Sequence, residues 1–334
     1  MQKRVIAAMA GALVLGATGA VPATAHGGHS EHGGQGGHGG HGGSTGHGAH
    51  QGHGTQGTQG GSAFGAPAKG PVTTFAISLS GAQEVPTPGG PAVNDPDGKA
   101  SGYLTLRGDR LTYSLQWKGL VPSLGHIHEG AKGKNGALKV TLFGAAMPDS
   151  VDRAAGHVSL TDAKLAAALR KDPAGFYVNL HSAEFPGGAV RGQLKKQTHP
   201  VNPLDVLRPG SLTALSNGEQ EVPKTDTSKV NDPDGQALTT LAPKGTGVGY
   251  SLAWVNIQSP SLGHIHRGVF GKNGDVVFNL FNRPVPTGVF AVSGKLNGQS
   301  AAAVKRVRAY PAEYYSNIHN LEYPDGAVRG QLFG

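Results

Sequence analysis

The sequence predicts an all-β protein built of two tandem Greek-key β-sandwich domains, each with one short helix. Three observations support this prediction: runs of alternating apolar and polar residues, turns of Gly, Pro, Asn and Asp between them, and a duplication of the whole pattern. A disordered segment rich in His and Gly is expected before the domains. The predicted segments are a signal peptide at 1–25, the disordered segment at 26–70, domain 1 at 71–197, a linker at 198–207 and domain 2 at 208–334.

The first domain shows seven runs with the two-residue alternation of β-strands. They are 73–80, 102–106, 111–117, 125–129, 137–143, 176–181 and 189–194. One helix is predicted at 161–172, "TDAKLAAALRKD", with Thr161 as its N-cap and Pro173 after its end. Its counterpart in the second domain is 297–311. Trp117 and Trp254 alternate with other apolar residues and are expected in the core.

The duplication can be followed motif by motif. "GAQEVP" at 81–86 returns as "GEQEVP" at 218–223, and "PSLGHIH" at 122–128 returns at 260–266. "NLHSAEFPGGAVRGQL" at 179–194 matches "NIHNLEYPDGAVRGQL" at 317–332. The two copies therefore share one architecture, and a residue kept in both is a candidate for a shared role.

Together these motifs resemble the CHRD domain, a family named from chordin and found in many exported bacterial proteins. The resemblance covers nearly all of 71–197 and 208–334 and implies an extracellular β-domain. A looser resemblance is to copper–zinc superoxide dismutase, a Greek-key β-protein whose copper strand carries His-x-His followed by Glu. His126, His128 and Glu129 fit that pattern, whereas the second copy has Arg267 at the last position. The dismutase disulfide and zinc-loop histidines are missing.

Composition limits the possible functions. The 334 residues include no cysteine, which excludes disulfides, thiolate ligands and thiol nucleophiles. The net charge of +8 comes from scattered Lys and Arg, with no basic stripe of the kind that binds nucleic acid. Lys3 and Arg4 precede an apolar run from Val5 to about Val21, and small residues at 23–25 follow it. We therefore expect signal-peptide cleavage near Ala25 and a secreted or periplasmic protein. No transmembrane segment is expected.

The "GHIH" motifs supply the best candidate site. Alternation places His126 and His128 on one face of a strand, and His181 follows 53 residues later. The second copy keeps both features, so we predict one three-histidine metal site per domain. The predicted ligands are His126, His128 and His181 in the first domain and His264, His266 and His319 in the second. Three neutral imidazoles suit Zn(II), Cu(II) or Ni(II), and we expect copper or zinc.

Other polar residues are expected to support metal binding or to have no role in it. Asn179 and its copy Asn317 share the face of the third histidine and are expected to support the ligands. The eight histidines of the disordered segment are predicted to collect metal at low affinity. His157 and His199 have no second copy and are interpreted as surface or loop residues.

Two further shared motifs have structural interpretations. Glu84 and Arg191, with their copies Glu221 and Arg329, are expected to form an ion pair that joins the first and last strands. The "NDPDG" motifs read as turns, because a calcium loop requires more oxygen ligands than they offer.

Two other functions are considered besides metal binding. In the first, the protein is an extracellular structural or adhesive module that binds a protein or polysaccharide and uses its histidines only for packing. In the second, which has less support, it is a redox enzyme of the dismutase type. No nucleophile elbow, His-Glu-x-x-His motif or phosphate-binding loop occurs, so the sequence predicts no catalytic residue and no enzyme.

Overall fold

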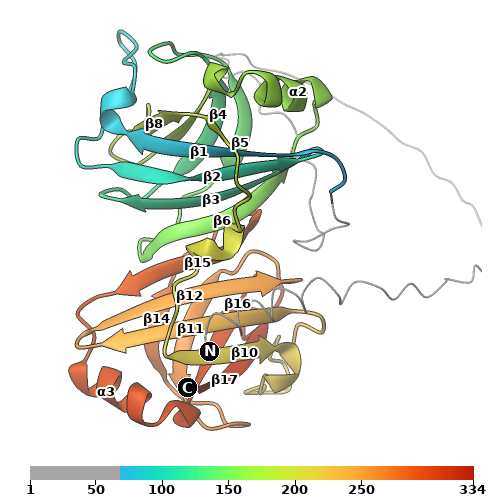
Figure 1. Ribbon diagram of the computed structural model, residues 1–334. Helices are drawn as coiled ribbons and strands as arrows, with labels where there is room; N and C mark the ends of the chain where they lie inside the picture. The colour runs from blue at the N-terminus through green and yellow to red at the C-terminus, as the bar shows by residue number, and fades with distance from the viewer. Residues whose placement is uncertain (1–67) are drawn as a thin grey trace, which may run out of the picture. The chain divides into compact units, whose positions relative to one another are not determined.

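The computed structural model describes residues 68–334, so the predicted signal peptide and nearly all of the His/Gly-rich segment lie outside it. Antiparallel β-sheet is the main secondary structure of the described part, with one α-helix in each repeat (Figure 1). The all-β prediction with one short helix per repeat is therefore confirmed. None of the helices in residues 68–334 is long and apolar enough to cross a membrane.

Corresponding strands occur in the two repeats. The first repeat contains β1 (Val72–Ser80), β2 (Lys99–Arg107), β3 (Arg110–Lys118), β4 (Leu124–Glu129), β5 (Leu138–Phe143), β6 (Val151–Ser159), helix α2 (Ala163–Lys171), β7 (Phe176–His181), β8 (Val190–Gln193) and β9 (Lys195–Gln197). The second contains β10 (Leu212–Asn217), β11 (Gln236–Lys244), β12 (Gly247–Val255), β13 (Leu262–Arg267), β14 (Val276–Phe281), β15 (Val289–Leu296), helix α3 (Ala301–Ala309), β16 (Tyr314–His319) and β17 (Val328–Phe333).

Backbone pairing gives the same strand order in both repeats. The order is β5-β4-β7-β8-β1-β2-β3-β6 in the first repeat. It is β14-β13-β16-β17-β10-β11-β12-β15 in the second. The chain passes between strands that are distant in this order after β3, after β5 and after β6, as in Greek-key folds. This order places β4 beside β7, the two strands that carry the predicted ligands.

Strand β6 is absent from the sequence prediction. Its sequence, "VDRAAGHVS", contains Ala and Gly, which are poor strand formers, so its alternation is weak. Pairing with β3 on one side and β15 on the other stabilises it, and Ala154 and Ala155 are fully buried. His157 lies on β6, half-buried, with its ring 6.1 Å from that of Phe290, so it is a strand residue and not a loop residue. His199 is exposed in a bend, as predicted.

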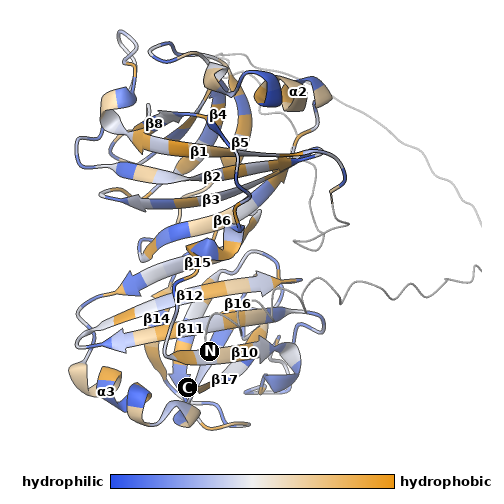
Figure 2. Ribbon diagram, in the orientation of Figure 1, coloured by the Kyte–Doolittle hydropathy of each residue, from blue (hydrophilic) through white to orange (hydrophobic). Residues whose placement is uncertain are grey.

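The core follows the predicted alternation. Along β3, Leu111, Tyr113, Leu115 and Trp117 are buried, and polar residues stand between them. Figure 2 shows this mixture of apolar and polar residues along the strands of both repeats. Trp254 is also buried, which confirms the core assignment of both tryptophans.

Two local predictions concern helix capping and turns. The N-cap of α2 is Asp162 rather than Thr161, since the Asp162 carboxylate accepts a hydrogen bond from the Lys164 N–H at 2.7 Å. The first "NDPDG" motif is a turn, as predicted. The buried Asp95 carboxylate accepts hydrogen bonds from the backbone N–H groups of Asp97 at 3.0 Å and Gly98 at 2.7 Å.

Candidate metal centre

Antiparallel pairing of β4 with β7 positions the first histidine triad. His126 lies opposite Asn179 and His128 lies opposite Tyr177, while His181 lies two residues further along β7. Alternation turns these side chains to one face of the sheet. The preceding Gly125 has a packing role, because a Cβ atom there would lie 2.4 Å from the ring of Phe143.

The structure brings the three predicted ligands together in each repeat. Each histidine offers a nitrogen within 4.8 Å of those of the other two. His126 Nδ1 lies 3.1 Å from His181 Nε2, and His264 Nδ1 lies 3.2 Å from His319 Nε2. Two nitrogens bound to one tetrahedral zinc ion at its usual bond lengths are about 3.3 Å apart. The spacing therefore matches that of two ligands of one ion, although the same contact is a hydrogen bond when no ion is bound.

Backbone carbonyls fix the tautomers of two rings in each triad. His128 Nδ1 lies 3.1 Å from the Gly136 carbonyl oxygen, and His181 Nδ1 lies 2.9 Å from that of Pro186. A carbonyl only accepts, so both Nδ1 atoms carry the proton and both Nε2 atoms keep a lone pair. The second repeat has the same contacts, from His266 to Gly274 at 2.9 Å and from His319 to Pro324 at 2.9 Å.

Burial favours the neutral form of all six imidazoles, because it lowers the pKa of each. Burial, together with the neighbouring rings of His181 and His128, lowers the pKa of His126 to about 4. Burial and the equivalent neighbours lower the pKa of His264 to about 4. The pKa values of the other four are also lowered, chiefly by burial: His128, His181, His266 and His319. Neutral imidazole is the form that binds a metal ion, so these sites need not lose a proton near neutral pH.

A Tyr–Arg stack supports one histidine in each triad, and the sequence does not predict it. The Tyr177 ring stacks on His128 with centroids 5.1 Å apart and planes 7° from parallel. The Arg191 guanidinium carbon lies 3.4 Å from the Tyr177 ring centroid. Tyr315 repeats the arrangement between His266 and Arg329. The signal available in the sequence was the Tyr-x-Asn-x-His face kept in both copies.

The predicted ion pair between Glu84 and Arg191 is not formed. Among residues 68–334 the ion pairs include neither these two residues nor their copies. Arg191 instead donates to the carbonyl oxygens of Ala131 and Lys134 and to Asn135 Oδ1. The guanidinium therefore holds the loop that follows β4, whose Gly136 carbonyl accepts from His128. This loop carries the sequence "GKNG" at 133–136, which returns at 271–274 in the second repeat.

Asn179 contacts Glu84 rather than the histidines. Its Nδ2 donates to Glu84 Oε2 at 3.4 Å, and Asn317 donates to Glu221 Oε2 at 3.3 Å. Burial raises the pKa of Glu84 to about 7 and that of Glu221 to about 8, against the opposing effects of the nearby Arg and Asn. The two asparagines were expected to support the histidine ligands, but the hydrogen bonds of their side chains go to Glu84 and Glu221.

The two triads differ in their surroundings. His266 and His319 are each only 8% exposed, whereas His128 and His181 are half-buried. Glu129, the residue that fits the dismutase pattern, pairs with Lys139 at 2.7 Å instead of taking part in the triad.

Comparison with protein-family models identifies both repeats. The CHRD domain model matches residues 75–194 and 212–332, which is more than half of the chain. The chain belongs to the CHRD family. The matched residues include every member of both histidine triads. Comparison with curated proteins and with solved structures found no match.

Each CHRD match contains a complete histidine site. Each CHRD domain contains its own β4–β7 type strand pair, its own triad and its own Tyr–Arg stack. A site assembled inside one domain does not depend on contacts between domains. The two copies of the site can therefore be altered separately, with one serving as the reference for the other.

Proposed function

We propose that this CHRD protein is exported and binds one copper or zinc ion in each domain. The ligands are His126, His128 and His181 in the first domain and His264, His266 and His319 in the second. The observation that supports the proposal most strongly is the convergence of three neutral imidazoles at the same place in both repeats. An ion bound by three imidazoles keeps a position for a further ligand.

The orientation of the rings also supports metal binding over packing alone. His128 Nε2 and His266 Nε2 are buried and have no hydrogen-bond partner within the described part of the chain. A buried lone pair without a partner is costly, and a metal ion would satisfy it. Histidines that served only to join two strands would be expected to use both nitrogens.

Export and the His-rich segment belong to the same proposal. The basic, apolar and small-residue order of residues 1–25 supports a signal peptide. Outside the cell, the eight histidines between His26 and His53 would collect metal weakly and raise its concentration near the two sites. We propose a binding protein and not an enzyme.

Metal content tests the proposal. The eight His-rich-segment histidines are first replaced by Ser, giving a tail-substituted chain in which only the domains can retain metal tightly. After loading and dialysis, elemental analysis is expected to find about two Cu or Zn ions per chain, one for each triad. The paired substitution His128→Ala and His266→Ala is expected to abolish retention, and His199→Ala, outside both triads, to leave it unchanged.

Other results would decide between the rival functions. A folded chain that retains no metal, or retains it equally after the paired substitution, would favour the structural or adhesive module. Superoxide turnover by the copper-loaded chain well above that of free copper would favour the redox enzyme instead. Circular dichroism of each variant shows whether the β-sheet has been preserved.

A further inference from the structure

A second group of unpartnered acceptors lies beside the first triad. Within residues 68–334, Glu84 Oε1, Asn179 Oδ1 and His128 Nε2 are all buried and have no hydrogen-bond partner. Asn179 is only 7% exposed. The second repeat leaves the same three atoms unpartnered, on Glu221, Asn317 and His266. Buried polar atoms are seldom left without a partner, so their repetition in two diverged copies points to a bound ligand that satisfies them.

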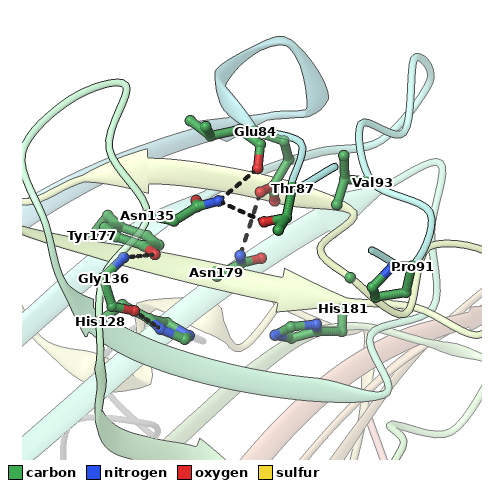
Figure 3. Close-up of a pocket in the computed structure, with 12 residues that line it drawn as sticks. Glu84, Thr87, Pro91, Val93, His128, Asn135, Gly136, Tyr177, Asn179 and His181 are labelled. Carbon is green, nitrogen blue, oxygen red and sulfur yellow. Dashed lines mark hydrogen bonds between the residues drawn. The ribbon is translucent and has the colours of Figure 1, made fainter. Parts of the chain in front are cut away.

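These acceptors line a cavity beside two histidines of the first triad, His128 and His181. The cavity has a volume of about 200 Å³, and its walls include Glu84, His128, Asn179 and His181. Figure 3 shows Asn179 between the two histidines and Glu84 on the far side of Asn179 from them. A small molecule in this space would meet the triad on one side and the carboxylate and amide oxygens on the other.

The position of the Glu84 carboxylate is built into the fold. Asn179 Nδ2 donates to one of its oxygens, and Gly188 packs against both. A Cβ at Gly188 would lie 2.8 Å from each carboxylate oxygen, and Gly188 has φ +142°, a conformation that favours glycine. Gly326 packs on Glu221 in the same way.

The unpartnered atoms determine which kind of ligand the cavity can bind. Once His128 Nε2 is bound to the metal ion, the atoms that remain free are Glu84 Oε1 and Asn179 Oδ1. Both accept hydrogen bonds when the carboxyl group is ionised, and a divalent cation in the triad favours the ionised form. A ligand carrying N–H or O–H would satisfy them, whereas an anion would place negative charge against a carboxylate. Anions therefore bind poorly there.

We propose that this cavity holds the exchangeable ligand of the metal, and that Glu84 and Asn179 select a small hydrogen-bond donor, such as water or a neutral amine, over an anion. Glu221 and Asn317 act in the same way in the second domain. This inference rests on the metal binding proposed above. It assigns Glu84 and Glu221 the role of specificity-determining residues that do not themselves bind the metal.

Ligand exchange on the copper-loaded, tail-substituted chain tests the inference. Copper content is measured first, so that a chain without bound copper exposes failure of the metal proposal before any ligand is added. Azide, an anion without hydrogen-bond donors, and imidazole, a neutral ligand with one N–H, are then titrated separately and followed by visible absorption and electron paramagnetic resonance.

The paired variant Glu84→Gln and Glu221→Gln removes the negative charge while keeping the shape. We expect azide to bind it at least about ten-fold more tightly than the unsubstituted sites, equivalent to about 1.4 kcal/mol, with imidazole bound no more tightly. The control pair Glu184→Gln and Glu322→Gln makes the same change in net charge on loops outside the cavity and is expected to alter neither ligand. The inference is overturned if azide affinity changes less than two-fold in the first pair, or equally in both.

Discussion

Tyr177 and His128 are directly opposite each other on β7 and β4, and their rings stack within 7° of parallel. The stack, together with the Gly136 carbonyl, leaves His128 one orientation in which Nε2 faces the triad. Replacement of Tyr177 by Leu is therefore expected to weaken metal binding at the first site by roughly 10–100-fold, the usual effect of losing a group that orients a ligand.

Tyr177→Phe is the matched control for that variant. It keeps the stacked ring and removes only the hydroxyl that accepts from the Gly136 N–H at 3.3 Å. We expect a loss of about 1 kcal/mol in stability and a much smaller change in affinity. Competition with a chromophoric chelator measures both sites, and the second serves as the reference. Unchanged affinity in Tyr177→Leu would show that stacking does not orient His128.

The substitution Arg191→Lys is expected to destabilise the protein. Its side chain is 1% exposed, and its planar fork reaches two loop carbonyls and an amide oxygen while stacking on Tyr177. A lysine ammonium cannot reproduce both contacts, so we expect Arg191→Lys to lower the free energy of unfolding by roughly 2–4 kcal/mol. Urea unfolding measures this loss. Arg283→Lys, at an exposed ion pair, should change stability by less than about 0.5 kcal/mol.

Two glycines with positive φ differ in how closely other atoms surround them. Gly188→Ala adds a Cβ 2.8 Å from the Glu84 carboxylate, whereas Gly133, at φ +75°, has nothing within 4 Å. We expect a loss of roughly 2–4 kcal/mol for Gly188→Ala and about 1 kcal/mol for Gly133→Ala, measured by thermal unfolding. Equal losses would contradict the close packing on Glu84.

Glu221→Gln is expected to stabilise the metal-free chain as the pH rises. Burial raises the pKa of Glu221 in the folded chain to about 8, above its ordinary value of 4.5, so the unfolded chain releases this proton at a lower pH than the folded one. Wild-type stability is therefore lost between about pH 4.5 and 8, and the variant lacks this loss. After allowance for solvent screening we expect a gain of roughly 1–3 kcal/mol at pH 8.5 and almost none at pH 4. A gain independent of pH would contradict the raised pKa.

The two sites should release metal at different rates. His266 and His319 are each 8% exposed, while their first-domain counterparts are half-buried, so a chelator reaches the first site more easily. Removal by EDTA from the tail-substituted chain is expected to show a fast and a slow phase. His128→Ala should remove the fast phase and His266→Ala the slow one; loss of the same phase in both variants would refute this assignment.

The fold was predictable wherever alternation was strong. Strands such as β3 bury the apolar residues at every second position, and this alternation of apolar and polar residues is visible in the sequence. Strand β6 was missed because its Ala and Gly residues carry little intrinsic preference, and its stability comes from pairing on both sides. The N-cap of α2 was displaced by one residue, because Thr161 and Asp162 are both good N-caps and local sequence does not choose between them.

The six candidate ligands were identifiable because duplication kept three histidines at one spacing in two diverged copies. The partner of Arg191 was not identifiable in this way. Charge pairing predicts Glu84, yet the loop after β4 offers carbonyl oxygens nearer to the guanidinium. Which acceptor lies within reach depends on the path of that loop, and the sequence does not specify the path.

By itself, the sequence determined the class of fold, the duplication and the identity of the candidate ligands, because periodicity and repetition are properties of residue order. The tertiary structure decided that His181 approaches His126. The two residues are 55 positions apart in the sequence, and the pairing of β4 with β7 brings His126 Nδ1 to 3.1 Å from His181 Nε2. It also decided that, within residues 68–334, one carboxylate oxygen of Glu84, Oε1, is buried beside a cavity without a hydrogen-bond partner. Burial and hydrogen-bond satisfaction depend on every neighbouring element at once, and only the folded chain brings those elements together.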